Sequence, residues 1–516
     1  MRRLLVVAML GLFAAPAARA ADRLLWGDLQ PGPFRVGFRV DRQADASRAE
    51  RPRTTLEGMP AKGSPLRTIE ITMWYPARPS SAQPIRFGDY MTYADDIVSD
   101  RAEDRAAPAD LETRRKNATH GFATFAIFNE TPESSWSPIL DSKMLAVLDA
   151  APASGRFPVI LHAPGANGTS VLVATTCEYL ASHGYVILSV PSRGQDALND
   201  RTSGGAFFES QARDLEYALA YATRLEFADA SRAGIFAWSR GGAAAVLLAM
   251  RDSRVSAVVG YDASAIETKR EADRLHESPF YDPDRLTVPI LEIRAGNSGT
   301  APPLFDSLRF APRYWINASG MHHLDFSVAA MIHAALGLQN QYIKLSPGKT
   351  RAAYAAINVA TQRFFDAFVK SKGKFSADGL PPSDVFSNGS LEALLPPPSP
   401  ALLLERIYAT KGIESARSII EATRRTSPQW RPFPEFVLDT VGSRMVELRR
   451  NEEAIQVLEL NTNLYPDSTR VWGSLGLVQE KLGYKDLAVE SFRKALTIDP
   501  KNEVATTGLA RVQKRE

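Results

Sequence analysis

Cysteine is nearly absent from this 516-residue sequence, which contains only Cys177. A single cysteine cannot form a disulfide within the chain, so the fold must be stabilised by packing rather than by internal cross-links. Cys177 lies in a predicted helix, and we interpret it as a packed core thiol. The length is enough for two or three domains.

Net charge is also small, with a formal value of +3 for the whole chain. Residues 1–20 hold three arginines and no acidic residue, so the remainder has a net charge of 3 − 3 = 0. A neutral chain is not typical of nucleic-acid binding proteins. The composition therefore predicts no nucleic-acid partner.

Long apolar runs are missing outside the N-terminus. There, Arg2 and Arg3 precede an apolar run over residues 4–15, and Ala18-Arg19-Ala20 follows it. This pattern is typical of a secretory signal peptide (residues 1–20), and the run is short for a membrane span. We expect cleavage after Ala20, export to the periplasm or secretion, and no membrane span.

The central part of the sequence alternates short apolar runs with longer amphipathic ones. Strands are predicted over 33–40, 67–75, 158–161, 185–190, 233–238, 255–261, 288–293 and 313–316, and helices over 170–182, 211–225 and 243–250. Such alternation indicates an α/β fold with a mainly parallel sheet covered on both faces. We predict one domain of this class over residues 21–375.

Two stretches depart from that pattern. Residues 85–150 are irregular and carry aromatics that could form a lid or one wall of a pocket, or pack an irregular surface layer. We interpret this stretch as an insertion. Residues 376–400 are rich in proline, including Pro396, Pro397 and Pro398, and are predicted to be a linker.

The C-terminal residues 401–516 contain a repeat of 34 residues. When 435–468 is aligned with 469–502, Gly442 falls on Gly476 and Pro466 falls on Pro500. Trp472, Gly476 and Pro500 fit the tetratricopeptide pattern of paired helices. A more degenerate unit begins near Pro397, and residues 504–514 are predicted to be a capping helix. The repeats imply a protein or peptide partner.

Ser239 stands in the run Gly234-Ile-Phe-Ala-Trp-Ser239-Arg-Gly-Gly242, between a predicted strand and a predicted helix. A serine at a sharp strand-to-helix turn needs small neighbours, which Ala237, Gly241 and Gly242 provide. The alternative interpretation is an ordinary helix N-cap. As a nucleophile, the serine would need a base, a group that orients the base, and donors for an oxyanion.

The candidate bases after Ser239 are His276, His322, His323 and His333. His322 and His323 lie in a loop after the last predicted strand, where a base can reach the serine, and only one of the two can do so. The candidate acids are Asp262, which follows the strand after the serine helix, and Glu292, which lies within the next strand. Asn297 occupies the usual turn position but cannot carry the charge. We prefer Asp262.

The oxyanion donors should be backbone N–H groups. Arg240, directly after Ser239, supplies one. The loop over residues 162–168 supplies the other, for which we select Ala166 beside Gly165. His162, at the start of this loop, is interpreted as a structural residue.

Residues 30–370 resemble α/β-hydrolases of the platelet-activating factor acetylhydrolase-like and dienelactone hydrolase-like groups. The resemblance lies in Trp74-Tyr-Pro-Ala, Leu180-Ala-Ser-His-Gly-Tyr185, Ser239-x-Gly-Gly and Gly320-x-x-His-x-x-Phe326. It selects His323 over His322, supports Asp262, and implies an oxyanion hole from Ala166 and Arg240. It further implies hydrolysis of small-molecule carboxylic esters without a metal or cofactor. Ala163-Pro164-Gly165 and Ala237 depart from the usual motifs.

We therefore expect an exported serine ester hydrolase with a tetratricopeptide tail. One rival is a serine peptidase of the prolyl oligopeptidase type, but the residues before the core sheet are too few for the propeller of those enzymes. The other rival is a catalytically inactive scaffold in which the repeats carry the function.

Overall fold

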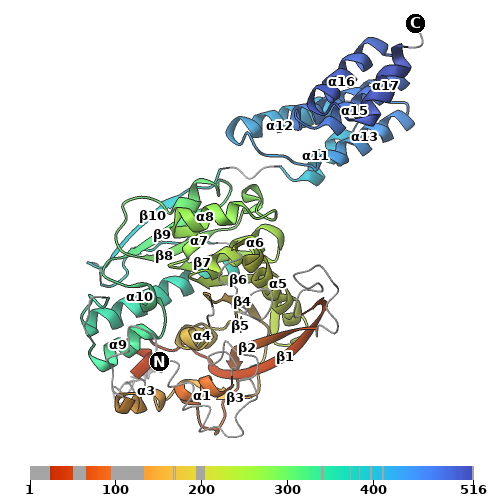
Figure 1. Cartoon of the computed structure of the whole chain (residues 1–516). Helices are drawn as coiled ribbons and strands as arrows, with labels where there is room; N and C mark the ends of the chain where they lie inside the picture. Colours follow the sequence, from red (N-terminus) through yellow and green to blue (C-terminus); the bar gives the residue numbers. More distant parts are fainter. Residues whose placement is uncertain are drawn as a thin grey trace, which may run out of the picture. The chain divides into compact units, whose positions relative to one another are not determined.

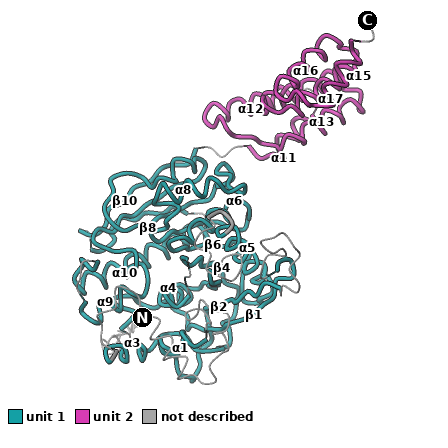
Figure 2. The backbone as a smooth tube through the Cα atoms, viewed as in Figure 1, with its two compact units in different colours: residues 1–394 teal, residues 395–516 magenta. Residues whose placement is uncertain are grey.

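The structure is a computed structural model that describes residues 24–49, 66–93, 133–166, 168, 170–192, 204–338, 342–371, 373–382, 384–394, 398–409 and 412–513. The predicted signal peptide (residues 1–20) and residues 94–132 of the predicted insertion lie outside this part of the chain. The chain divides into two compact units, Met1–Leu394 and Leu395–Glu516, which Figure 2 shows in different colours.

A ten-stranded sheet forms the centre of the first unit, in the order β10-β9-β8-β7-β6-β4-β5-β2-β1-β3 (Figure 1). The strands are β1 (Arg35–Ala49), β2 (Leu66–Ala77), β3 (Ala146–Leu148), β4 (Phe157–Ala163), β5 (Val186–Ser189), β6 (Ala228–Trp238), β7 (Val255–Tyr261), β8 (Ile290–Ala295), β9 (Arg313–Ala318) and β10 (Phe386–Leu391). From β5 to β9 all neighbours are parallel, whereas β1–β2, β2–β5 and β9–β10 are antiparallel. The predicted mainly parallel sheet is confirmed.

Helices cover both faces of this sheet. They are α1 (Phe87–Tyr93), α3 (Ser137–Leu140), α4 (Ala174–Ser182), α5 (Gly204–Ala222), α6 (Gly241–Arg251), α7 (Ser264–Glu267), α8 (Lys269–His276), α9 (Ala329–Leu336) and α10 (Pro347–Phe365). Apolar residues of α4, α9 and α10 share one core with Phe236, and those of α5, α6 and α8 share the other core with Ile235. Successive β6 residues thus point to opposite faces, as in a strand buried on both sides.

This strand order, with a sharp serine turn after β6, is the α/β-hydrolase fold that the sequence predicted. Cys177 is buried in α4, as expected for a core thiol. No helix within the described residues is both long and apolar enough to cross a membrane.

Two stretches differ from the sequence prediction. Within the predicted linker 376–400, β10 pairs with β9, so the sheet extends beyond residues 313–316 and the first unit continues to Leu394. Within the predicted insertion 85–150, β3 pairs in parallel with β1 at the other sheet edge. Tyr90 and Trp136 of this stretch are buried in the core rather than exposed as parts of a lid. Both short strands are held by pairing with residues far away in the sequence.

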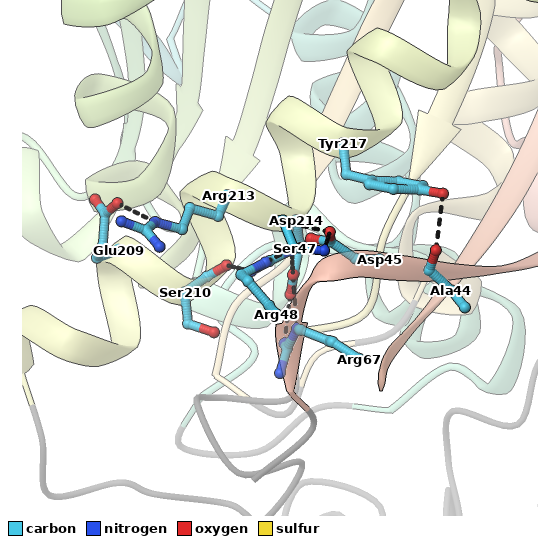
Figure 3. A network of polar contacts seen from close by, with 10 residues as sticks. All are labelled: Ala44, Asp45, Ser47, Arg48, Arg67, Glu209, Ser210, Arg213, Asp214 and Tyr217. Carbon is cyan, nitrogen blue, oxygen red and sulfur yellow. Dashed lines mark hydrogen bonds and ion pairs between the residues drawn. The ribbon is translucent and has the colours of Figure 1, made fainter. Parts of the chain in front are cut away.

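Buried charges attach the long β1 strand to α5 (Figure 3). The Arg67 side chain, at the start of β2, donates from Nε and Nη2 to the two carboxylate oxygens of Asp214, at 2.7 and 2.5 Å. Arg48, near the end of β1, lies 2.8 Å from the same carboxylate and also pairs with Asp45. Asp214 is therefore the shared anion of two arginines.

Helices are the regular elements found in the described residues of the second unit. They are α11 (Pro400–Tyr408), α12 (Ile413–Thr426), α13 (Glu435–Glu447), α14 (Asn451–Leu464), α15 (Thr469–Lys481), α16 (Lys485–Ile498) and α17 (Glu503–Gln513). A Cβ atom on Gly476 of α15 would lie 2.6 Å from Phe492 of α16, so the small residue allows the close helix approach that the repeat pattern predicts. The helices α11 and α12 lie where the sequence predicts a more degenerate unit, and α17 lies where it predicts a capping helix.

Candidate active site

Ser239 occupies the turn between β6 and α6. Its φ is 56°, in the left-handed region that residues with a side chain rarely adopt. Backbone bonds hold this conformation: the Ser239 N–H donates to Tyr261 O at 3.1 Å, and the Ser264 N–H donates to Ser239 O at 3.0 Å. The strained turn that the sequence predicted at Ser239 is present.

Small residues are required where this turn crosses the rest of the sheet. A Cβ atom on Gly241 would lie 2.0 Å from the carbonyl oxygen of Ala163 on β4, and one on Gly242 would lie 2.6 Å from Ala263 Cβ. The first clash involves backbone, which cannot move aside without shifting β4. Because these glycines have no side chain, the first turn of α6 can lie close to the sheet.

Asp262 directly follows β7 and also has a positive φ, of 45°. Its backbone N–H donates to Ile293 O at 2.7 Å, and its Oδ1 accepts the Ala295 N–H at 2.9 Å. Its other oxygen, Oδ2, lies 2.5 Å from Nδ1 of His323. One carboxylate oxygen is thus fixed to β8, and the other faces the histidine.

His323 begins the short 3₁₀ turn η8 (His323–Phe326), and about a third of its side chain is exposed. The adjacent His322 instead caps this turn, with its Nδ1 accepting the Leu324 N–H at 3.4 Å, and burial lowers its pKa. Of the two candidates that the sequence left open, the structure brings His323 to Asp262.

The remaining histidines lie in other environments. His333, on α9, is buried and lies 3.2 Å from Asp325, whose carboxylate also accepts the His322 N–H. His276, at the end of α8, has its ring 4.7 Å from that of Tyr281. Asp325 and His333 therefore anchor the loop that carries His322 and His323.

Glu292 does not contact the histidine through any bond described in the structure. It is fully buried on β8, and its Oε1 accepts the Ala263 N–H at 2.7 Å. Through this hydrogen bond Glu292 holds the backbone of the turn that follows Asp262. The sequence did not single out Glu267 and Arg294, which form an ion pair of 3.2 Å in the same region. Their only sequence signal was charge near the ends of β7 and β8.

The loop after β4 passes directly beside Ser239. A Cβ atom on Gly165 would lie 3.0 Å from Ser239 Cβ, and the Gly168 N–H closes a turn onto Gly165 O at 2.8 Å. Gln211 of α5 donates to Pro164 O at 2.7 Å and fixes the loop from outside. Ala166 follows Gly165 in this turn.

Arg240 directly precedes α6, and the first N–H groups of a helix have no carbonyl partners within it. Its guanidinium group points to Phe207 and Phe208, with its carbon 5.1 and 5.7 Å from the two ring centres. The side chain is therefore engaged on α5, and only its backbone is left to serve the site.

His162 lies within β4 and is fully buried, with its ring stacked on Phe236. Its Nδ1 is 2.8 Å from Ser189 Oγ. Burial lowers the pKa of His162 to about 3. Among the described residues, no cluster of three or more His, Cys, Asp or Glu side chains has an arrangement that could hold a metal ion.

Comparison with known proteins gives a family match at the C-terminal end of the chain and a structural neighbour for a larger part of it. Residues 469–502 match the family model for the tetratricopeptide repeat. Among solved structures, the chain is similar to a ferulic acid esterase from Streptomyces cinnamoneus, with 19% identity, 73% of this chain and 98% of that chain covered, and a TM-score of 0.48. No curated protein matches the sequence.

Proposed function

We propose that the first unit is a serine hydrolase that cleaves small-molecule carboxylic esters. The observation that carries the proposal is the arrangement around the strained Ser239 turn: Asp262 directly follows the neighbouring strand β7, and Asp262 bonds to His323. A nucleophile on a sharp turn and a carboxylate-bound imidazole are the parts that acyl transfer through a serine requires.

The reaction proceeds in two halves. Ser239 Oγ attacks the ester carbonyl carbon while His323 accepts its proton, and His323 then passes that proton to the leaving alcohol. Because Nδ1 of His323 is bound to Asp262, Nε2 is the nitrogen that receives the serine proton. Asp262 fixes the ring and stabilises its charged form. Water then releases the acyl group by the same steps.

The backbone N–H groups of Ala166 and Arg240 are proposed to bind the oxyanion of the tetrahedral intermediate. This assignment rests on the closeness of the Gly165 turn to Ser239 and on the position of Arg240 before α6. Each such donor contributes about 2.7–4 kcal/mol to catalysis in enzymes of this mechanism.

Export and partner binding are further parts of the proposal. Residues 1–20 direct the chain out of the cytoplasm, and N-terminal sequencing of the exported protein should begin at Ala21.

The repeats of the second unit bind a protein or peptide. If the first unit is an autonomous enzyme rather than part of a scaffold, a chain ending at Leu394 should retain its activity on a small ester.

Labelling with a fluorophosphonate probe, followed by peptide mapping, tests the proposal. We expect the label on Ser239 and none on the Ser239→Ala protein, with turnover of a short aryl ester reduced by roughly four to six powers of ten. Ser264→Ala is the matched control, because Ser264 contacts Ser239 only through its backbone N–H. A folded wild-type protein that takes no label would refute the assignment.

A further inference from the structure

A buried carboxyl group, Glu292, lies directly behind the Asp262 turn and has no part in the steps described above. Its Oε1 binds the N–H of Ala263, and Asp262 Oδ1 binds the N–H of Ala295 in return. The two side chains therefore connect the ends of β7 and β8 in both directions. Moving Glu292 would tilt the segment that aims Asp262 at His323.

Negative charge is crowded at this place. Asp262, Glu267 of α7 and Glu292 of β8 supply three carboxyl groups, and Arg294 of β8 is the cation that faces them. Arg294 pairs with Glu267 at 3.2 Å and donates to Asn317 Oδ1 at 2.6 Å. Asp262 pairs with His323. Within the part of the chain that the structure describes, Glu292 has no ion-pair partner.

The second oxygen of Glu292 lies in a still less polar position. Oε2 is buried and has no hydrogen-bond partner among the described residues. A Cβ atom on Gly260 would lie only 1.8 Å from it, so this oxygen lies directly against the backbone of β7. An ionised carboxylate with one unpartnered oxygen and no counter-ion in such a place is strongly unfavourable.

The same environment raises the pKa values of Glu292 and Glu267. Burial, and then the charge of Glu267, raises the pKa of Glu292 well above its usual range. Burial raises the pKa of Glu267 to about 7 against the opposing effect of Arg294. Glu267 has Arg294 as its counter-ion, whereas Glu292 has an unpartnered oxygen and no ion pair among the described residues, so the geometry favours the neutral form at Glu292.

We propose that Glu292 is a positioning residue that works as a neutral carboxylic acid, holding the Asp262 turn through Ala263 while Asp262 remains the ionised partner of His323. The inference rests on the proposed function of these two residues. A second negative charge behind Asp262 would stabilise the protonated imidazole and raise the pH at which His323 can accept a proton. A neutral Glu292 supplies the hydrogen bond without that charge.

Infrared spectroscopy of the full-length protein at neutral pH tests the protonation state without any turnover. A protonated carboxyl group gives a carbonyl band separate from that of a carboxylate. The wild-type minus Glu292→Gln difference spectrum should contain the protonated band. A difference spectrum that contains only a carboxylate band would overturn the proposal, even if Ser239 proves to be the nucleophile.

Kinetics tests the positioning role. Glutamine is neutral and its Oε1 can still accept the Ala263 N–H, so Glu292→Gln should keep kcat/KM within about twofold and leave the acid limb of the pH profile unmoved. Glu292→Leu leaves that N–H without an acceptor and should lower kcat about tenfold or more, with little change in KM.

A shift of the acid limb to lower pH in Glu292→Gln would mean that the wild-type residue is charged, which would overturn the proposal. An unchanged kcat in a folded Glu292→Leu protein would overturn the positioning role. If that variant does not fold, the pH profile of Glu292→Gln and the infrared spectrum still test the proposal. A protein without esterase activity would refute the proposed function but leave the infrared result valid.

Discussion

The indole ring of Trp238 stacks on the imidazole ring of His323. The ring centres are 5.1 Å apart and the planes differ by 21°. The indole Nε1 also donates a hydrogen bond to the backbone carbonyl oxygen of His323, at 3.2 Å. The residue immediately before the candidate nucleophile therefore contacts both the ring and the main chain of the candidate base. One side chain thus connects the segment that leads into the Ser239 turn with the loop that carries His323.

Trp238→Phe should test this coupling. Phenylalanine keeps an aromatic face against His323 but removes the N–H that bonds to its carbonyl oxygen, so the imidazole loses one of its constraints. We expect kcat on an aryl ester to fall about threefold to tenfold with KM little changed. Trp315→Phe is the matched control, since Trp315 lies on β9 and its ring is tilted against that of Phe305 instead. Equal kcat values for wild type and Trp238→Phe would contradict the role of the indole.

Replacement of the buried Asp214 should lower the stability of the protein strongly. Its carboxylate and the Arg67 side chain are almost fully buried, and Arg48 is largely buried beside them. Asp214→Ala leaves two arginines without their shared anion, and should lower the free energy of unfolding by about 3–5 kcal/mol. Urea denaturation measures the change.

The control for this variant is Asp141→Ala, which breaks the exposed pair of Arg86 and Asp141. Exposed pairs contribute about 0–1 kcal/mol. If both variants lose the same small amount, the network in Figure 3 does not stabilise the attachment of β1 to α5.

Gly241→Ala should damage the serine turn without touching a polar group. The added methyl would lie 2.0 Å from the backbone oxygen of Ala163, so β4 and α6 must move apart. We expect a loss of about 1–3 kcal/mol in unfolding free energy and a large drop in fluorophosphonate labelling. Gly299→Ala is the matched control because nothing lies within 4 Å of its Cβ position. Unchanged labelling in Gly241→Ala would show that the turn tolerates the shift.

Local patterns in the sequence were sufficient to predict the strained turn at Ser239 and the position of Asp262 at a strand end. Both depend on short runs of apolar and small residues, whose structural meaning does not need the rest of the chain. The choice between His322 and His323 did not follow from position in the loop, because the two are adjacent; the resemblance to known hydrolases selected the one that faces Asp262.

Long-range pairing explains what the sequence did not predict. The β10 segment Phe386–Leu391 lies among prolines and is mostly exposed, so its pattern resembles a linker until β9 pairs with it. Glu267 and Glu292 are 25 positions apart, and their proximity depends on the tertiary fold, which brings α7 within reach of Arg294 on β8. No spacing rule brings two such carboxyl groups together.

His162 should make the protein lose stability in acid. Its pKa is about 3 in the folded state against 6.5 for an ordinary histidine, because burial disfavours the charged ring. Between these pH values the unfolded chain binds a proton that the folded chain does not. The contribution of His162 to the free energy of unfolding therefore falls by roughly 1.4 kcal/mol for each pH unit below 6.5, until about pH 3.

His162→Asn should remove this dependence, since the asparagine amide can still bond to Ser189 but does not titrate in this range. Urea denaturation of both proteins between pH 4 and pH 7 gives the two slopes, and their difference isolates His162 from the other titrating groups. Ser189→Ala is the control: it removes the hydrogen-bond partner but leaves the buried imidazole, so its slope should follow that of the wild type. Parallel curves for wild type and His162→Asn would mean that the folded protein accepts a charged ring beside Phe236, which its stacking and complete burial argue against.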